Sequence, residues 1–416
     1  MINQPKTVTI GLFGFGVVGS GLYQALLQNP RPGTSIKKVC IRNPEKERKA
    51  SANLFTTDPN LLLEDPAINL IVELTDDAEA AFKIVSRALE MGKAVITANK
   101  KMIAEHLPEL LALQAKYLTP LLYEASCCAN IPVIRSLEEY YGNEPLQSIS
   151  GIVNGSTNYI LTRMSEDKAD FDYALAQAQA EGFAESNPCF DTEGTDAVNK
   201  LSILLVHAYG IIAPPAEIVH TGIQHLHTYD SVFAKDKGYE IKLIARAVKQ
   251  QDGSIAAFVL PQFVKSNHPL QNVKNEYNGI VIENDFGDRQ FYYGKGAGSF
   301  PTASAVLSDI SAFRYGYKYE YKKLYRHPST PAKDFYLRVF LSCKSLGNVP
   351  KEHFERIDEC EQSGNRCHVT GIIHFSALLK TSWWKSENVS LIVLPDVFAD
   401  YRLLKPLKPE EETVFA

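Results

Sequence analysis

The chain has 416 residues, of which 45% are hydrophobic, and its formal net charge at pH 7 is −5. This length allows two or three domains, and the slightly acidic charge excludes the basic field of typical nucleic-acid-binding proteins. No apolar run approaches the roughly 20 residues that span a bilayer, so we expect no membrane partner. The N-terminus lacks a secretory signal, and seven scattered cysteines without a CxxC pair are typical of a reduced, cytoplasmic protein.

The first predicted element is a strand, VTIGLFG, that runs into a glycine turn and a helix. Gly14, Gly16 and Gly19 follow the G-x-G-x-x-G pattern, with Val17 and Val18 between the last two glycines. Here glycine permits the tight turn, the close approach of backbone to a pyrophosphate, and the packing of helix on strand. The pattern predicts a dinucleotide site, with a glycine turn that binds nothing as the alternative.

Arg42 stands at the end of the second predicted strand, residues 36–43. NAD sites usually place an acidic residue there to hold the ribose hydroxyls, whereas an arginine suits the 2′-phosphate of NADP. We therefore expect NADP to be preferred over NAD. The alternative is a solvated arginine on a loop.

Strands and helices continue to alternate up to about residue 130, which predicts a mostly parallel, doubly wound sheet of the Rossmann type over residues 1–130. Ligands of such sheets lie at the carboxyl ends of the strands. Thr75 ends the strand NLIVELT and Lys100 ends KAVITANKK. Both are candidate site residues, and the alternative for Lys100 is a surface lysine.

The pattern changes from residue 131, where an α+β domain over 131–318 is expected. A helix over 195–210, which we expect Thr195 to cap, carries Asp196 and Lys200 four residues apart on one face. Glu185 lies shortly before this helix and joins them if the loop folds back. Two carboxylates can hold a substrate ammonium group, and a lysine can exchange a proton with a carbonyl or alcohol oxygen. The alternative is a surface ion pair of little value.

Two hairpins are expected next, with turns at Asp252-Gly253 and at DFGD. A glycine-rich turn with Gly296 and Gly298 then leads into a helix with Pro301 near its start. We expect this segment, 296–318, to return to the first domain.

Six motifs in this order resemble homoserine dehydrogenases: GFGVVG, TANKK, EASCCANIPVI, GIVNGSTNYIL, GFAESNPCFDTEGTDAVNKL and GAGSFPTASAVLSDI. The resemblance covers roughly residues 7 to 313. It implies NAD(P)H-dependent reduction of aspartate 4-semialdehyde to homoserine, on the route to threonine and methionine, by a homodimer or homotetramer.

Carried over by position, the resemblance makes Lys200 the acid/base at the C4 oxygen and Lys100 a second lysine near it. Glu185 and Asp196 would bind the substrate amino group, and Gly182, Gly296 and Gly298 would lie against the cofactor. The resemblance also implies a monovalent cation (Na⁺ or K⁺) on backbone carbonyls, at Glu124, Cys127, Ala129 and Ile131.

The chain departs from the family pattern in the first two domains. Asp76 and Asp77 stand where small glycines are common, which would weaken cofactor binding or shift the choice between NAD and NADP. Ala129-Asn130 stands where the family usually has glycine, which bears on the geometry of the cation loop, although asparagine tolerates a positive φ better than most residues.

The tail is expected to be a linker, 319–332, followed by a ferredoxin-like domain, 333–416, with the order βαββαβ. In it KEHFERI (351–357) is predicted to be a short helix. The order resembles the ACT regulatory domains that bind amino acids, but CKSLGNV replaces their acid-x-Pro-Gly turn. Feedback regulation by threonine and a packing or oligomerisation role are both open.

Two other functions compete with this interpretation. A Rossmann dehydrogenase for another amino acid or semialdehyde would use the same carboxylates and lysine, and a substrate panel distinguishes it. A non-catalytic NADPH sensor would bind the cofactor without turnover. We expect no fused kinase, since no N-terminal stretch remains to hold one.

Overall fold

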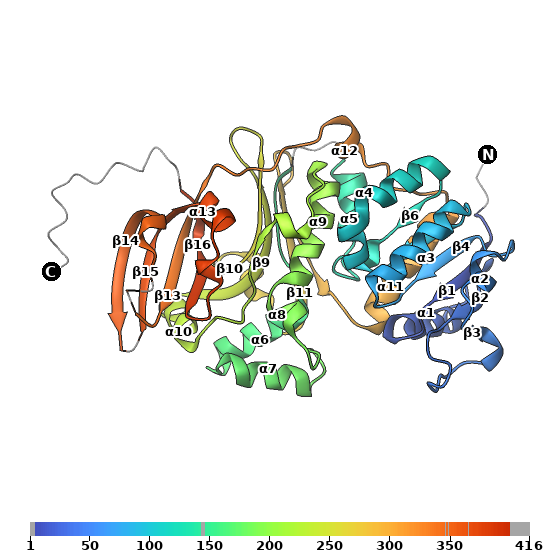
Figure 1. Cartoon of the computed structure of the whole chain (residues 1–416), viewed down its shortest axis with the longest axis horizontal. Helices are drawn as coiled ribbons and strands as arrows, with labels where there is room; N and C mark the ends of the chain where they lie inside the picture. Colours follow the sequence, from blue (N-terminus) through green and yellow to red (C-terminus); the bar gives the residue numbers. More distant parts are fainter. Residues whose placement is uncertain (1–4, 143–145, 346, 348, 365, 400–416) are drawn as a thin grey trace.

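The computed structural model describes residues 5–399 except 143–145, 346, 348 and 365. A parallel sheet lies at one end of the molecule, a mixed sheet in the middle and the tail at the other end (Figure 1). Among the described helices, none combines the length and the hydropathy that crossing a bilayer requires.

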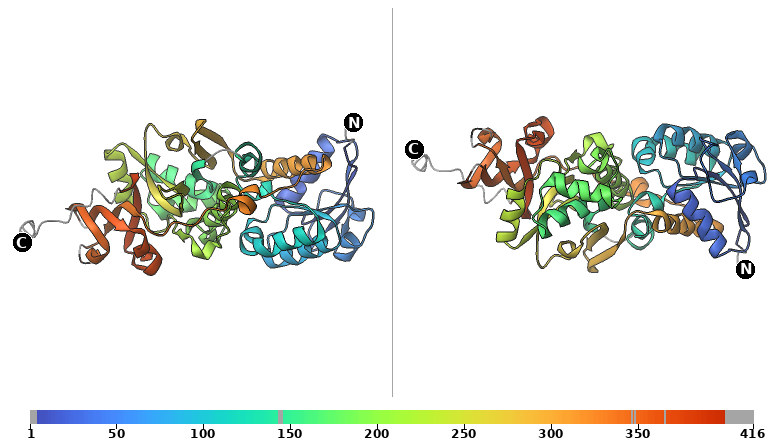
Figure 2. Two further views of the ribbon diagram at one scale, coloured as in Figure 1. Left: turned by 90° about the horizontal axis from the view of Figure 1, so that it is seen from above. Right: turned by 90° about the horizontal axis from the view of Figure 1, so that it is seen from below.

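The parallel sheet has the strand order β3-β2-β1-β4-β5-β6. Helices cover both faces, with α1 and α11 on one side and α3 and α4 on the other (Figure 2). The central strands β1, β4 and β5 are mostly apolar because both of their faces are buried, whereas β2 is partly exposed. This confirms the predicted Rossmann-type sheet. Its elements are β1 (Val8–Phe13), α1 (Val17–Gln28), β2 (Thr34–Cys40), β3 (Phe55–Thr56), α2 (Asn60–Leu63), β4 (Leu70–Glu73), α3 (Ala78–Glu90), β5 (Ala94–Thr97), α4 (Lys100–Tyr117), β6 (Leu121–Leu122) and α11 (Ser299–Arg314).

Helix α11 comes from far along the chain and packs on α1. The Ser299 hydroxyl donates to the Val17 carbonyl at 2.8 Å, and a Cβ at Gly21 would collide with Ser299. Glycine at position 21 therefore allows the two helices to lie in close contact.

The middle of the molecule is an antiparallel sheet covered by helices, and both predicted hairpins are present in it. Its strands belong to a larger sheet with the order β12-β11-β7-β9-β10-β16-β13-β15-β14, with β8 paired to β10. The elements of this middle part are α5 (Val133–Arg135), a π-helical turn (Ser136–Tyr140), β7 (Leu146–Ile152), α6 (Gly155–Glu166), α7 (Phe171–Ala180), α8 (Cys189–Thr192), α9 (Thr195–Tyr209), β8 (Val219–His220), α10 (Thr228–Asp236), β9 (Tyr239–Lys249), β10 (Ile255–Lys265), β11 (Tyr277–Asn284) and β12 (Asp288–Lys295).

The tail has the strand order β16-β13-β15-β14, which is that of the ferredoxin-like plan. The predicted helix over 351–357 is wrong: only Lys351–His353 form a 3-10 turn, and the next residues begin β14. Phe354, Arg356 and Ile357 pair with β15, and this tertiary pairing overrides the local helical spacing of the apolar residues. The tail elements are β13 (Tyr336–Cys343), β14 (Phe354–Ser363), β15 (Arg366–His374), α13 (Phe375–Lys380) and β16 (Val389–Phe398), and residues 400–416 of the expected domain lie outside the described residues.

The segment before the tail is packed rather than extended. It contains α12 (Lys322–Arg326), and the Tyr321 side chain before this helix is buried. The strand β10 then pairs with β16 in parallel through Gln262 and Val393. The tail is thus joined to the middle of the molecule by continuous sheet.

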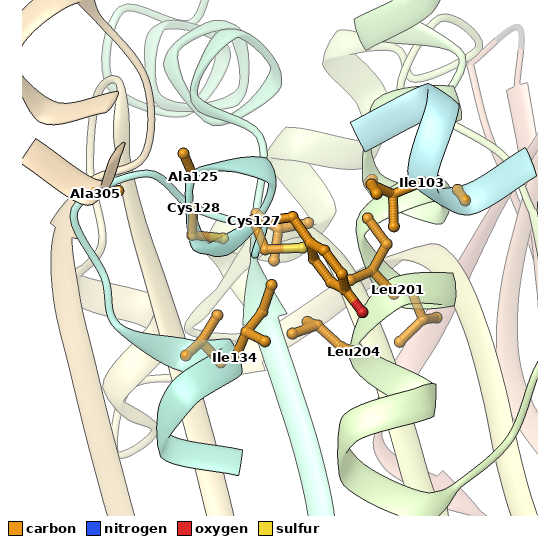
Figure 3. Packing of buried hydrophobic residues seen from close by; sticks show 14 of the residues in the cluster. Ile103, Ala125, Cys127, Cys128, Ile134, Leu201, Leu204 and Ala305 are labelled. Atoms are coloured by element: carbon orange, nitrogen blue, oxygen red, sulfur yellow. The ribbon is translucent and has the colours of Figure 1, made fainter. Parts of the chain in front are cut away.

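The main hydrophobic core runs from the parallel sheet into the middle domain. Figure 3 shows this junction, where Ile103 of α4, Cys127 and Cys128, Ile134 of α5, and Leu201 and Leu204 of α9 gather with Ala125 and Ala305. Because α4 and α9 share this core, their polar N-terminal turns are held in a fixed relation.

Candidate active site

Three charged side chains meet between α4 and α9. The Lys200 Nζ lies 2.7 Å from Asp196 Oδ2, and the Lys100 Nζ lies 2.9 Å from Asp196 Oδ1. Asp196 and Lys200 are buried, while the Lys100 side chain is about one-third exposed. The structure therefore brings together the three residues that the sequence singled out on separate grounds.

The local sequence explains this placement. Helix α4 begins at Lys100 because the Asn99 side chain caps it, accepting from the Met102 N–H at 3.0 Å. Helix α9 begins at Thr195, but its cap is Gly194 with φ 84°, so the predicted Thr195 cap is wrong. The left-handed conformation at Gly194 favours glycine and turns the chain sharply into α9. Asp196 thus falls in the first helical turn.

Opposite charges dominate the protonation of this pair. Burial alone would raise the pKa of Asp196, but Lys100 and Lys200 outweigh it and hold this pKa below its usual range. Burial alone would lower the pKa of Lys200, but the Asp196 carboxylate raises it above the usual lysine range. Lys200 is therefore a protonated donor at neutral pH, with the Val153 carbonyl as a second acceptor at 2.6 Å.

Two further polar side chains, Asn154 and Asp191, belong to this cluster. The Asn154 amide donates to Asp196 Oδ2 at 2.8 Å and to Asp191 Oδ1 at 2.7 Å, while its own oxygen caps α6. Burial, together with repulsion from Asp196, raises the pKa of Asp191. Neither residue was predicted from the sequence to belong to the site, although they lie in the motifs GIVNGSTNYIL and FDTEG.

Glu185 is not in contact with these groups. It lies between α7 and α8 on the surface, and within the described residues its side chain makes no hydrogen bond or ion pair. Gly182 ends α7 nearby with φ 79° and is also exposed. Besides Asp191, Phe190 of α8 reaches the cluster, since Lys100 Nζ lies 5.7 Å from its ring centroid.

The glycine turn before α1 has the shape that a pyrophosphate needs. Gly14 has φ 89°, and a Cβ there would lie 2.5 Å from the Leu74 carbonyl oxygen. A Cβ at Gly19 would collide with the Gly14 carbonyl, whereas Gly16 faces open space. No side chain caps α1 at Gly16, so its first N–H groups remain available to an anion. Val17 is largely exposed beside them and Val18 is half-buried.

Thr75 is anchored by a buried carboxylate. Its N–H and hydroxyl both donate to Glu73 Oε1 at 2.6 Å, and the Thr97 hydroxyl donates to Glu73 Oε2 at 2.7 Å. Asn99 donates to the Thr75 carbonyl at 3.2 Å. Burial raises the pKa of Glu73. The carboxyl ends of β4 and β5 are thereby tied together beside the glycine turn.

Arg42 forms an ion pair with Asp76, one of the two acidic residues that depart from the family pattern. Its guanidinium lies 3.1 Å from Asp76 Oδ1, and both side chains are strongly exposed. Asp77 instead caps α3, accepting from the Ala80 N–H at 3.0 Å. Arg42, Asp76 and Asp77 line one open cavity of about 410 Å³ together with Ala78, Glu79, Lys101 and Glu105.

The second glycine turn precedes α11. Gly298 caps this helix with φ 112°, and a Cβ at Gly296 would overlap the Asn278 side chain. The helix α11 that follows packs on α1, the helix that begins at the first glycine turn.

The expected cation loop has an unusual backbone. The positive φ values fall on Cys128 (55°) and Ala129 (40°), and not on Asn130. Within the described residues, no hydrogen bond reaches the carbonyls of Cys127 and Ala129, whereas those of Glu124 and Ile131 accept from Cys127 and Val133. Two buried carbonyls without partners fit the demand of a cation for oxygen ligands.

Comparison with known proteins decides the family. The family model described as homoserine dehydrogenase matches residues 132–311, and the one described as its NAD binding domain matches residues 14–124. A homoserine dehydrogenase from Helicobacter pylori is 40% identical over 312 residues, which are 73% of this chain and 73% of the relative. The chain belongs to the homoserine dehydrogenase family.

Solved homoserine dehydrogenases share most of this architecture. The enzyme from Thiobacillus denitrificans superposes with a TM-score of 0.81 at 29% identity, over 94% of this chain and 99% of that one. A Staphylococcus aureus homoserine dehydrogenase at pH 6.5 gives 0.71 at 27% identity, over 93% and 98%. A hyperthermophilic archaeal mutant in complex with NADPH gives 0.64 at 27% identity, over 75% and 99%. The chain is thus an oxidoreductase with a nicotinamide cofactor domain.

Proposed function

We propose that this homoserine dehydrogenase reduces L-aspartate 4-semialdehyde to L-homoserine with NADPH, and runs the reverse oxidation, in the synthesis of threonine, methionine and isoleucine. The observation that carries the proposal is the meeting of Lys100, Asp196 and Lys200 between the two domains. A buried lysine held in its charged form beside a carboxylate suits an oxygen that must gain a proton as an aldehyde becomes an alcohol.

Lys200 is the proton donor in this proposal. The bound cofactor supplies the hydride in the reductive direction. As the C4 oxygen takes on negative charge, Lys200 gives it a proton and Lys100 stabilises it electrostatically. In the reverse direction Lys200 must first lose its proton, and because its pKa is raised, this loss needs a more alkaline pH.

Asp196 and Glu185 bind the substrate ammonium group in this proposal. The Asp196 carboxylate already contacts both lysines and Asn154, so it has little free acceptor capacity. The ammonium group therefore partly replaces Lys100 and Lys200 as the counter-charge, which lowers the pKa of Lys200 toward the range of a base. Glu185 supplies the second carboxylate from the exposed loop before α8.

The cofactor lies against Gly14, Gly16, Val17, Val18, Gly19, Thr75, Lys100, Gly182, Gly296 and Gly298. We propose NADP as the preferred form, because Arg42 is exposed at the rim of the cavity and suits a 2′-phosphate. Asp76 opposes this preference, since it must give up Arg42 before the phosphate can bind, so NAD remains the alternative.

A monovalent cation, Na⁺ or K⁺, is proposed on the carbonyls of Glu124, Cys127, Ala129 and Ile131. The carbonyls of Cys127 and Ala129, which accept no hydrogen bond within the described residues, support it. The seven free thiols suit a reducing, cytoplasmic location. A homodimer or homotetramer is proposed because β12 is an edge strand with exposed aromatic side chains.

The test is to follow reduced nicotinamide by absorbance at alkaline pH with L-homoserine and either NADP or NAD. We expect turnover, with a higher kcat/KM for NADP. Turnover only with another amino acid in a substrate panel would favour the alternative dehydrogenase. Binding of NADPH without any turnover would favour the sensor.

A further inference from the structure

A histidine and two glutamates gather on the tail, far from the candidate active site. A carboxylate oxygen of Glu359, one of Glu361 and a ring nitrogen of His368 lie within 4.8 Å of one another. Glu361 pairs directly with His368 across β14 and β15, and Glu359 lies two residues along the same strand. Regular pairing of these strands therefore holds the three side chains on one face.

The burial of His368 and the missing hydrogen bond at its ring distinguish this cluster from a solvated acidic patch. The residue is only 2% exposed, and its Nε2 is buried without a hydrogen-bond partner. The Tyr229 hydroxyl of α10 lies 2.8 Å from Nδ1, and the Phe340 ring stacks on the imidazole with centroids 5.1 Å apart. An orphaned buried nitrogen is costly unless a ligand satisfies it.

The two glutamates also lack a counter-charge. Within the described residues no lysine or arginine forms an ion pair with Glu359 or Glu361, although Asp358, just before them, contacts Arg338 and Arg356. One imidazole nitrogen and two carboxylates are a donor set that suits Zn²⁺ and similar divalent ions, and their charges balance.

We propose that Glu359, Glu361 and His368 form a binding site for a divalent transition-metal ion of the Zn²⁺ type. The ion would satisfy Nε2, and Tyr229 would orient the ring through Nδ1, as the outer partners of metal-binding histidines do. Since Tyr229 belongs to α10, the ion would fasten the edge strand β14 to β15 and to the middle of the molecule (Figure 1).

A second histidine–carboxylate group serves as the comparison, and it consists of Glu79, Glu105 and His106. It lies partly at the rim of the cofactor cavity, and the His106 Nε2 already contacts Glu79 at 3.3 Å while the ring stacks on Phe82. His106 is also only partly buried. It therefore shows no orphaned buried nitrogen.

The test is equilibrium titration of the full, untagged, chelator-treated protein with Zn²⁺, and with Co²⁺ to identify the ligands by absorption. We expect one ion per chain, a Co²⁺ spectrum without thiolate bands, and a rise in Tm on binding. Glu361 is exposed, so its replacement should not disturb the fold. Glu361→Gln and Glu359→Gln should each weaken Zn²⁺ binding at least about tenfold. Tyr229→Phe should weaken it by about tenfold.

Matched controls are Glu355→Gln on the same strand and Glu105→Gln in the second group, and both should bind Zn²⁺ like the wild type. The proposal is overturned if the wild type binds no ion. It is also overturned if binding persists in Glu361→Gln, if Glu105→Gln abolishes it, or if the Co²⁺ spectrum shows thiolate ligands.

Discussion

Asp196 forms ion pairs with both lysines at the candidate site. It is a buried carboxylate shared by Lys100, Lys200 and Asn154. The i,i+4 spacing identified its pair with Lys200, and the end of a parallel strand identified Lys100. Asn154 and Asp191 escaped prediction because they reach the cluster by tertiary contact, and their types are equally common in caps and loops.

Removing Lys200 should stop proton transfer without unfolding the cofactor domain. In Lys200→Ala we expect kcat for homoserine oxidation to fall by about a hundredfold or more, while NADPH affinity changes little. Steady-state kinetics and fluorescence titration of NADPH measure the two quantities. Lys101→Ala, next to Lys100 but exposed, is the control and should keep kcat, whereas near-normal turnover in Lys200→Ala would disprove the role.

The pH dependence should follow Lys200 as well. Its pKa is raised, so the basic form needed for oxidation accumulates only as pH rises, and the acid form needed for reduction is lost over the same range. We therefore expect kcat for oxidation to increase with pH and kcat for reduction to decrease. In Asp196→Asn the rise should move to lower pH, because the carboxylate that holds the proton is gone. An unmoved profile would assign the titration to another group.

Arg42 and Asp76 should affect the cofactors in opposite senses. Arg42→Ala should weaken NADP binding by about tenfold, since a charged hydrogen bond to the 2′-phosphate is lost, and leave NAD nearly unchanged. Asp76→Asn frees Arg42 and should strengthen NADP binding by about threefold, as befits an exposed ion pair. Dissociation constants for both cofactors are measured, with Glu79→Gln in the same cavity as control. Equal losses for NADP and NAD in Arg42→Ala would rule out the 2′-phosphate contact.

Helix α10 connects the middle of the molecule to the tail. Its buried Asp230 accepts from the Ser342 hydroxyl of β13 at 2.5 Å and from the Ser390 hydroxyl of β16 at 2.8 Å, and from the His227 N–H at 2.8 Å. The sequence offered no sign of this connection, because an acid in the first turn of a helix is ordinary. From the sequence alone, Ser342 and Ser390 could each lie on the inward or the outward face of its strand.

Loss of this carboxylate should loosen the tail first. Asp230→Ala leaves two buried hydroxyls unpaired, and we expect it to lower the free energy of unfolding by about 2–4 kcal/mol. Hydrogen exchange should accelerate in β13 and β16 but not in the parallel sheet. Asp236→Ala, exposed on the same helix, is the control. Equal exchange in Asp230→Ala and wild type would show that α10 does not hold the tail.

At the scale of the element, periodicity predicted the parallel sheet and both hairpins correctly. It was wrong at residues 351–357, where a local helical pattern gives way to β14 because β15 offers backbone partners from Phe354 onward. It also predicted residues 319–332 to be a linker, whereas the Tyr321 side chain in this segment is buried. The sequence did not show this because the burial of Tyr321 depends on partners distant in sequence. Among these, the Tyr123 hydroxyl lies 3.1 Å from that of Tyr321.

At the scale of the whole molecule, β12 lies at one end of the large sheet and exposes aromatic side chains. Phe291 and Tyr293 of β12 are 42% and 53% exposed, and Tyr293 stacks on Tyr277. We expect light scattering to give at least twice the chain mass, and Phe291→Asp to shift the assembly toward monomer. Leu118→Asp, an 88% exposed leucine elsewhere, should leave the assembly intact. A monomeric wild type, or equal effects of both substitutions, would exclude β12 as the contact.

The continuous sheet between the middle of the molecule and the tail has a consequence for any shortened form of the chain. β10 contributes Ala256, Phe258 and Leu260 to the same apolar cluster as the tail strands, and β16 covers its edge at Gln262. A fragment that stops before β13 would expose unpaired backbone N–H and C=O groups of β10 beside an apolar face that the tail normally buries. An exposed apolar strand edge of this kind promotes aggregation. Translation that halts there, or a protease that cuts there, would therefore yield an insoluble product rather than a smaller working enzyme.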